Sequence, residues 1–249
     1  MWYAATVEMS AEALDLVYPF TGRWLVQNSP ADQVPSHGTT RFATSYAIDF
    51  VPVDASGRSA VFGLGSLFRP EPPEQFIGFG RSVLAPVAGV VVAVHDSATD
   101  HPAYRGLPSL GYAMTQRRRA DAGWLALAGN HIMIRTGTAV VALCHLQQGS
   151  VQFQVGQTVQ IGEKLGRCGN SGNSTEPHLH VQAISSLDIA RADAVPIRFS
   201  GTLPPAGDIV DLLASELHQR LLSAPRFRPR VRRHGHIRSA PPAAIGRGT

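Results

Sequence analysis

Cysteine is scarce in this chain, long apolar runs are missing, and no standard secretion signal is visible; the first two absences each exclude a class of protein. The two cysteines, Cys144 and Cys168, cannot form a disulfide framework and lack the spacing of a zinc knuckle. Both lie in apolar patterns that predict buried small residues. No run of about eighteen apolar residues appears, so no membrane-spanning helix is expected. Residues 1–10 lack the basic start and apolar core of a standard secretion signal.

Positive charge is concentrated at one end of the chain. The formal net charge is +4, yet residues 225–249 hold seven arginines and no acidic residue, which leaves −3 for residues 1–224. The seven are Arg226, Arg228, Arg230, Arg232, Arg233, Arg238 and Arg247. Such a tail is typical of a solvated, disordered end, and it also suits contact with acidic polymers such as nucleic acid or bacterial wall polymers.

Short β-rich runs punctuated by glycine predict a compact antiparallel β-sheet or β-sandwich domain over residues 44–200, in a mainly β chain. Residues 95–128 break this rhythm and predict a long inserted loop with a short helix. Residues 1–43 are expected to form an N-terminal extension and lead-in loop. Helical spacing of apolar residues predicts a C-terminal helix within 201–224, before the 225–249 tail. Strands are expected over 46–53, 131–135, 138–145 and 178–183, and as a pair around a Pro-x-x-Gly turn within 82–94.

The segment Pro-His-Leu-His-Val-Gln at 177–182 carries the strongest chemical signal. Alternate side chains of a strand share a face, so His178, His180 and Gln182 are expected to lie together, opposite the apolar residues between them. Two imidazoles on one rigid strand can reach a single small site, as a metal centre with catalytic assistance requires. The alternative is a pair of surface histidines on a half-exposed strand.

Two further residues extend this set. Asp49 ends an alternating apolar run, where a carboxylate is costly to bury unless a metal or another charge compensates it. The alternative is a strand-end aspartate that caps a turn. His145 closes another apolar strand, and taken alone it is more often a surface residue than a catalytic one.

Seven short motifs follow one another in a specific order: Ala-Ile-Asp, Ala-Pro-Val-Ala-Gly-Val-Val, Gly-Asn-His-Ile, Cys-His-Leu, Val-Gly-Gln-Thr-Val, Gly-Asn-Ser-Gly and Pro-His-Leu-His. In this order they resemble the lysostaphin-like (LytM-type) zinc metallopeptidases of the peptidoglycan-hydrolase class, with the duplicated hybrid motif fold, over about residues 44–185. The resemblance implies a Zn²⁺ cofactor with Asp49 and His180 as ligands. It also implies that His145 and His178 are catalytic histidines and that one coordination position stays open for water.

One position departs from the family pattern. The family's first zinc ligand is a histidine four residues before the aspartate, and here that position is Ser45, whose neutral hydroxyl is a poor zinc ligand. His37 is the best substitute, because Gly38 would let its loop fold back over the strand. His95, His101 and His131 are weaker candidates. The competing interpretation is a degraded zinc site.

The resemblance implies a zinc-dependent metalloendopeptidase that hydrolyses peptide bonds in peptidoglycan cross-bridges or stem peptides. The alternative is a catalytically inactive domain of the same fold that binds peptidoglycan or activates another hydrolase. A biotinyl or lipoyl carrier domain is a third interpretation, but Lys164 lacks the motif that a carrier needs. Members of the resembled family mostly work in the bacterial envelope, and the resemblance implies this location. A cytoplasmic location stays open because no secretion signal is visible in the sequence.

Overall fold

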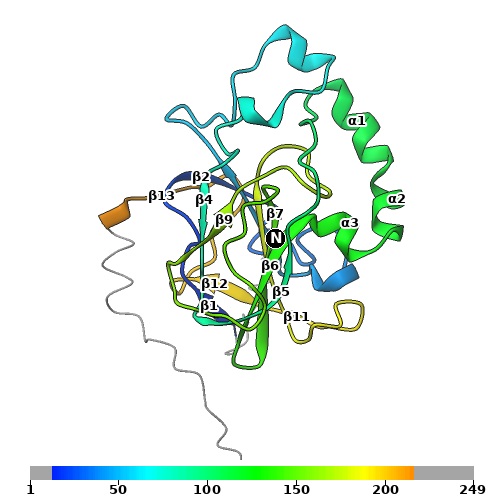
Figure 1. Ribbon diagram of the computed structural model, residues 1–249. Helices are drawn as coiled ribbons and strands as arrows, with labels where there is room; N and C mark the ends of the chain where they lie inside the picture. Colours follow the sequence, from blue (N-terminus) through cyan, green and yellow to red (C-terminus); the bar gives the residue numbers. More distant parts are fainter. Residues whose placement is uncertain (1–12, 216–249) are drawn as a thin grey trace, which may run out of the picture.

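A twisted nine-stranded sheet forms the centre of the molecule, in the computed structural model that describes residues 13–215 (Figure 1). Its strands run in the order β13-β2-β3-β10-β7-β6-β5-β8, and β11 pairs with β10. Every pairing in this sheet is antiparallel, so the predicted mainly β, antiparallel fold is confirmed. The strands are β2 (Gly22–Gln27), β3 (Ile48–Pro52), β5 (Gly89–His95), β6 (Asn130–Thr136), β7 (Ala139–Leu146), β8 (Thr158–Val159), β10 (Leu179–Ile184), β11 (Ala194–Val195) and β13 (Ile209–Leu212).

Two small sheets cover one face of this large sheet and give the fold its sandwich character. The first pairs β4 (Ser82–Leu84) with β9 (Lys164–Arg167) in antiparallel fashion, and the second pairs β1 (Leu14–Leu16) with β12 (Ile197–Phe199) in parallel. The main hydrophobic core lies between these layers. Its largest fully buried side chains include Trp24, Phe20, Phe50, Phe199 and Leu143.

A second, smaller core covers the opposite face of β6, β7 and β10 and includes Met133, Ala142, Cys144 and Ile184. The central strands β7 and β10 are therefore buried along their whole length. A strand enclosed on both faces reads as a near-continuous apolar run, as Ala-Val-Val-Ala-Leu-Cys does in β7. Polar residues on these strands stand out because burial needs compensation.

The inserted segment between β5 and β6 contains three short helices, where the sequence predicted one short helix in a long loop. They are α1 (Leu107–Met114), α2 (Gln116–Asp121) and α3 (Trp124–Ala128), and they stand together on one side of the sheet (Figure 1). Short 3-10 helices occupy Arg41–Ala43, Leu64–Leu67 and Pro73–Gln75. Within residues 13–215, no helix is long and apolar enough to cross a membrane.

The C-terminal helix prediction is wrong for its first part. Ile209–Leu212 forms β13, which pairs with β2, and helical geometry begins only at Ala214. The free edge of β2 offers backbone partners to this segment, whose β-branched pair Ile209-Val210 suits a strand. The remainder of that helix and the arginine-rich tail lie outside the described residues. The predicted N-terminal extension contributes β1 and β2, and the domain boundaries stay a prediction.

Candidate metal centre and catalytic cleft

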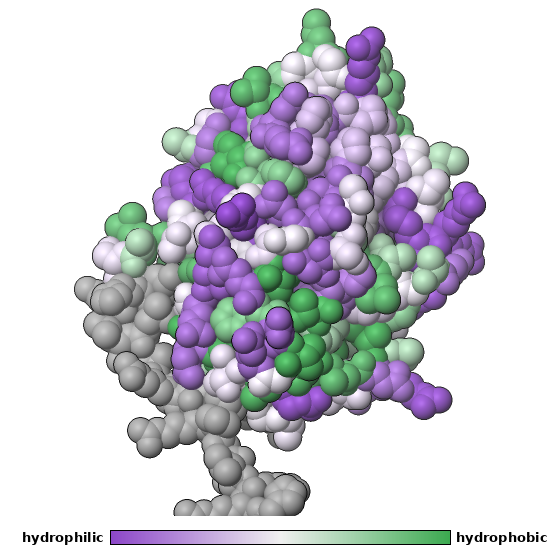
Figure 2. All heavy atoms as spheres, in the orientation of Figure 1, coloured by the Kyte–Doolittle hydropathy of each residue, from purple (hydrophilic) through white to green (hydrophobic). Residues whose placement is uncertain are grey.

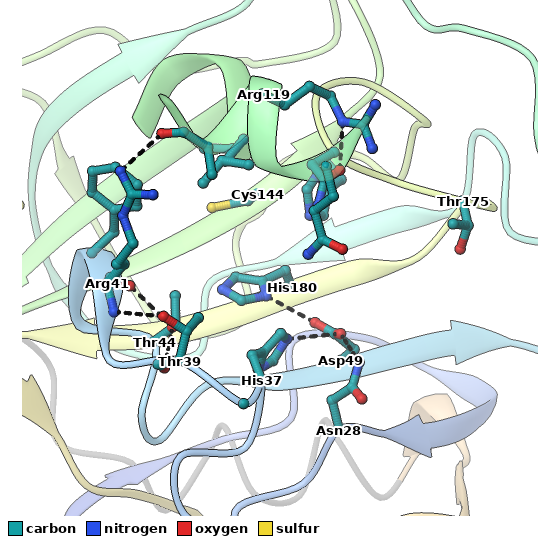
Figure 3. A pocket seen from close by; sticks show the side chains of 18 of the residues that line it. Asn28, His37, Thr39, Arg41, Thr44, Asp49, Arg119, Cys144, Thr175 and His180 are labelled. Carbon is teal, nitrogen blue, oxygen red and sulfur yellow. Dashed lines mark hydrogen bonds and ion pairs between the residues drawn. The ribbon is translucent and has the colours of Figure 1, made fainter. Parts of the chain in front are cut away.

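Three side chains from separate parts of the chain converge where β3 and β10 lie side by side. Asp49 Oδ1 lies 2.8 Å from His180 Nδ1, and Asp49 Oδ2 lies 3.0 Å from His37 Nε2. One candidate ligand atom from each residue lies within 4.8 Å of the other two, and within residues 13–215 this is the one such group of three or more. Figure 3 shows the three side chains pointing toward one another at the floor of a cleft.

In His37 and His180 the inner ring nitrogen faces Asp49 and the outer one faces away from it. Both outer nitrogens have hydrogen-bond partners, and these partners determine the protonation of the inner nitrogens. His180 Nε2–H donates to Gln182 Oε1 at 2.9 Å, and the amide is oriented because Gln182 Nε2 donates to the Phe42 carbonyl at 3.0 Å. His37 Nδ1–H donates to Ser36 Oγ at 3.0 Å, whose own proton goes to the Ala47 carbonyl at 2.7 Å. In a neutral ring, the inner nitrogen is thus left with a lone pair directed at a carboxylate oxygen. That arrangement is repulsive unless a proton or a cation lies between them.

A divalent metal ion fits this donor set. Two neutral imidazole nitrogens and one carboxylate are the ligands of many catalytic zinc sites, with a fourth position left for water. Ligating histidines almost always donate their second ring N–H to an oxygen acceptor, as both do in this cluster. The residues therefore fit the zinc ion that the resemblance implies.

Strand pairing and a tied loop bring these residues together. His180 and Asp49 are direct cross-strand partners in the β10–β3 register, so their side chains share a face at close range. His37 arrives on the loop between β2 and β3, which is tied to the residues before β3 by the Ser36 backbone N–H donating to Ser45 O at 3.0 Å. Gly38 follows with a φ of +67°, a left-handed conformation that glycine adopts without strain.

The strand that carries Asp49 begins later than the sequence predicted. Residues 45 and 46 form a turn, and β3 starts at Ile48. Ser45 consequently does not share the strand face of Asp49, and it is absent from the residues that line the cleft. His37, twelve positions before Asp49 along the chain, lies against the Asp49 carboxylate instead, at 3.0 Å.

Electrostatics within the cluster keep the carboxylate charged. Burial by itself raises the pKa of Asp49, but the charge of His37 and the hydrogen bonds from His180 and His37 hold that pKa well below its usual value. Burial lowers the pKa of His37, and the Asp49 carboxylate more than reverses this, so the net pKa is raised. A buried anion with cationic or metal partners is the expected state of this site.

His145 and His178 stand beside the cluster with one nitrogen each directed into the cleft. His145 Nδ1–H donates to Ser171 O at 2.9 Å, and His178 Nδ1–H donates to Glu176 O at 2.8 Å. In a neutral ring this tautomer leaves Nε2 as an acceptor, and the two ring centroids are 4.6 Å apart. Burial, with the neighbouring histidines His178 and His180, holds the pKa of His145 well below its usual value. His145 is consequently neutral near pH 7.

A bulge in β7 places His145 on the face that the site needs. In the β6–β7 ladder, Asn130 pairs with Leu146 and Ile132 with Leu143, so Cys144 and His145 together oppose His131. His145 adopts a φ of +62°, which is uncommon for a residue with a side chain and is typical of functional positions. Cys144 and His145 consequently both line the cleft, although neighbours on a regular strand face opposite ways.

The cleft above these residues has a volume of about 890 Å³. One wall is the loop that carries His37, and the facing wall is formed by α1, α2 and α3 of the inserted segment, with Tyr112, Arg119 and Trp124. Arg119 lies over the Tyr112 ring at 3.7 Å and donates to Asn173 Oδ1 at 2.7 Å, which anchors the helices to the loop before β10. Arg41 bridges the two walls, 3.2 Å from Asp121.

The structure brings together all five residues that the sequence singled out, His37, Asp49, His145, His178 and His180. The weaker candidates lie elsewhere in the fold: His95 and His131 stack on each other, and His101 Nε2 contacts Gly172 O.

Sequence reasoning missed two supporting residues. Asn28, in a left-handed conformation just after β2, donates from Nδ2 to Asp49 Oδ2 at 2.8 Å. Ser36 holds the His37 ring. The motif Ser-His-Gly at 36–38 was the available signal for Ser36, whereas nothing in the sequence pairs Asn28 with Asp49.

Part of the chain matches a known protein family. Residues 112–190 match the sequence model of Peptidase family M23. Among solved structures, the chain is similar to the catalytic domain of the antimicrobial peptidase lysostaphin from Staphylococcus simulans, at 20% identity over 60% of this chain and 74% of that one, with a TM-score of 0.34.

Two further structures show a similar degree of likeness. The M23 metalloprotease pseudoalterin from the deep sea is 16% identical over 80% of this chain and 87% of that one, with a TM-score of 0.40. A zinc-containing peptidase from Vibrio cholerae is 18% identical over 59% of this chain and 48% of that one, with a TM-score of 0.31. The chain also spans less than half of lysostaphin taken as a whole, 44%. The predicted resemblance to the lysostaphin-like peptidases is confirmed by the match to Peptidase family M23 over residues 112–190.

Proposed function

We propose that this chain, of which residues 112–190 match Peptidase family M23, is a zinc-dependent endopeptidase that cleaves peptide bonds in peptidoglycan cross-bridges or stem peptides. The observation that carries the proposal is the arrangement of His37 and His180. Both have their outer ring N–H bound to an oxygen acceptor and their inner nitrogen directed at Asp49. A structural role alone would not require both features, the oxygen acceptor at the outer N–H and the carboxylate facing the inner nitrogen.

His37 Nε2, His180 Nδ1 and the Asp49 carboxylate would hold the zinc ion. Zinc bound at such a site supplies a Lewis acid for the peptide carbonyl and lowers the pKa of a water molecule toward 7. Asn28 fixes the orientation of the Asp49 carboxylate through its amide. The protein thereby presets the ligand geometry before substrate arrives.

His145 and His178 are suited to moving protons and stabilising charge. Each has an Nδ1–H locked on a backbone carbonyl, so each Nε2 can accept a proton in the cleft and return it to the leaving amine. Once protonated, either ring becomes a hydrogen-bond donor to the oxyanion that develops on the cleaved carbonyl. The bulge at His145 holds its ring 4.6 Å from His178, so the two can act on one reacting centre.

The cleft, of about 890 Å³, has room for a peptide substrate. Its walls come from the His37 loop and the inserted helices, and its floor carries the five candidate residues. Two parts of the proposal rest on the family resemblance alone. They are peptidoglycan as the substrate and the bacterial envelope as the location. The arginine-rich tail at 225–249 is proposed to contact acidic polymers, and its deletion should then abolish their salt-sensitive binding.

Metal content and activity of matched histidine variants test the proposal. The full chain should contain about one equivalent of zinc and release soluble peptides from purified cell-wall sacculi. His37→Ala should lose both, whereas His95→Ala, which removes a histidine outside the cluster, should keep both. Zinc below about half an equivalent with no effect of His37→Ala would refute the metalloenzyme. A zinc-loaded chain without peptide release would instead support an inactive binding domain.

A further inference from the structure

Helix α1 presents its apolar stripe to solvent. Leu107, Leu110 and Met114 follow one another at helical spacing and have exposed fractions of 58%, 63% and 85%. The inward side of the helix is occupied by Tyr112, which stacks on Tyr104 at 4.5 Å. A surface helix of a globular protein normally turns such a stripe toward the core. In α1 the orientation is reversed.

A second exposed apolar segment lies against the start of α1. In residues 61–68, the side chains of Val61, Phe62, Leu64 and Phe68 are 87%, 52%, 84% and 67% exposed. Figure 1 places this segment beside α1 at the top of the molecule, and Figure 2 shows hydrophobic spheres projecting there.

Close backbone packing joins the two segments into one surface. Gly106, just before α1, lies so close to Leu67 that a Cβ at this position would be 2.7 Å from the Leu67 Cα. Arg105 donates from Nη2 to the Val61 carbonyl at 3.0 Å and lies over the Phe62 ring at 5.2 Å. The exposed side chains of residues 61–68 and of α1 are called the apolar rim below. Because its two parts are bound to each other, the apolar rim is a fixed feature of the fold.

Positive charge borders the apolar rim. The stretches 61–75 and 105–119 contain five arginines and two glutamates. Glu71 is neutralised by a two-pronged ion pair with Arg105, at 2.7 Å for both contacts. Arg69 and Arg118 are exposed, whereas Arg117 lines the cleft. The surface therefore combines projecting apolar side chains with a surplus of guanidinium groups.

We propose that the apolar rim docks on an anionic lipid surface. Apolar side chains that enter the headgroup region, together with arginines that pair with lipid phosphates, are what an interfacial helix requires. A contiguous exposed apolar patch is also a general mark of an interaction site, and the bordering arginines select an anionic partner. The same inserted helices form one wall of the cleft. If the proposed peptidase function holds, docking would direct it to peptides held close to a bilayer.

Sedimentation with lipid vesicles tests the docking independently of peptidase activity. The full chain should bind vesicles of phosphatidylcholine mixed with phosphatidylglycerol and bind pure phosphatidylcholine vesicles much less. Leu110→Ser/Met114→Ser should weaken binding to the mixed vesicles about ten-fold or more. Arg69→Gln/Arg118→Gln, at two exposed arginines outside the cleft, should weaken it and reduce its dependence on salt. All variants keep residues 225–249, so any contribution of the arginine-rich tail is the same in each.

Val155→Ser is the matched control, because Val155 is 62% exposed in a loop remote in sequence from the apolar rim. It should bind as the unaltered chain does. Wild-type vesicle binding by Leu110→Ser/Met114→Ser would overturn the proposal, as would failure of the unaltered chain to bind mixed vesicles. Concentration-dependent self-association that disappears in this double variant, without vesicle binding, would identify a second copy of the chain as the occupant and equally overturn it. Unchanged zinc content of each variant shows that the site remains intact.

Discussion

Gln182 links His180 to the loop that carries His37, and its replacement should weaken metal binding without removing a ligand. The side chain is fully buried, accepts from His180 Nε2 and donates to the Phe42 carbonyl. Gln182→Met keeps a similar volume and removes both hydrogen bonds. Loss of an outer partner of a ligating histidine typically lowers metal affinity about 10- to 100-fold, or about 1.4–2.7 kcal/mol. We expect this loss of zinc affinity for Gln182→Met.

Gln182→Glu provides the matched control. A carboxylate can still accept from His180 Nε2 and increases the basicity of the ring, so zinc affinity should be kept or increased. Both variants lose the donor to the Phe42 carbonyl, and both should lose about 1–3 kcal/mol of stability through that buried oxygen. A difference in zinc affinity between them therefore cannot arise from the lost Phe42 contact.

Competition with a chromophoric zinc chelator measures the affinities, and urea unfolding of the metal-free proteins measures the stabilities. The expected order of affinity places Gln182→Glu at or above the unaltered chain and Gln182→Met below it. A folded Gln182→Met variant that binds zinc as tightly as the unaltered chain would refute the reasoning that Gln182 sets the His180 tautomer.

Three further predictions follow from buried groups and close backbone contacts. Burial raises the pKa of the Cys168 thiol, which is fully buried and does not line the cleft, so a thiol reagent should modify it only at the rate of unfolding. Rapid modification of Cys168 in the native chain, located by peptide mass, would contradict this. Hydrogen bonds from Arg105 hold the pKa of Glu71 below 4.5, so Glu71→Gln should cost about 1–3 kcal/mol at pH 7, a deficit that shrinks as pH falls below that value, measured by urea unfolding across pH. Gly89→Ala should lower the free energy of unfolding by about 3 kcal/mol, because its Cβ would meet the Arg135 carbonyl. Gly111→Ala, in open space on α1, should raise it by about 1 kcal/mol. Equal effects of the two substitutions in urea unfolding would contradict this packing argument.

The strands around the site could be predicted because their patterns are local. The alternation at 178–182 predicted that His178, His180 and Gln182 share a face, and in the structure His178 and His180 line the cleft while Gln182 binds His180. The inserted helices were underestimated, because their apolar residues Leu107 and Leu110 face outward and give no signal of a packed helix. The segment Ile209–Leu212 was assigned to a helix because a strand partner on β2 is not visible from local spacing.

The amino-acid sequence by itself determined the identity of the chemical groups: an aspartate in an apolar strand, a His-x-His pair, a third strand histidine and a histidine beside a glycine. These residue types and their order indicate a metal site because few other arrangements tolerate such groups in apolar surroundings. Only the tertiary structure decided which atoms meet. Strand register paired Asp49 with His180, a bulge turned His145 toward them, and a tied loop brought His37 within 3.0 Å of Asp49. Those distances depend on contacts between residues far apart in the chain, which no local pattern encodes.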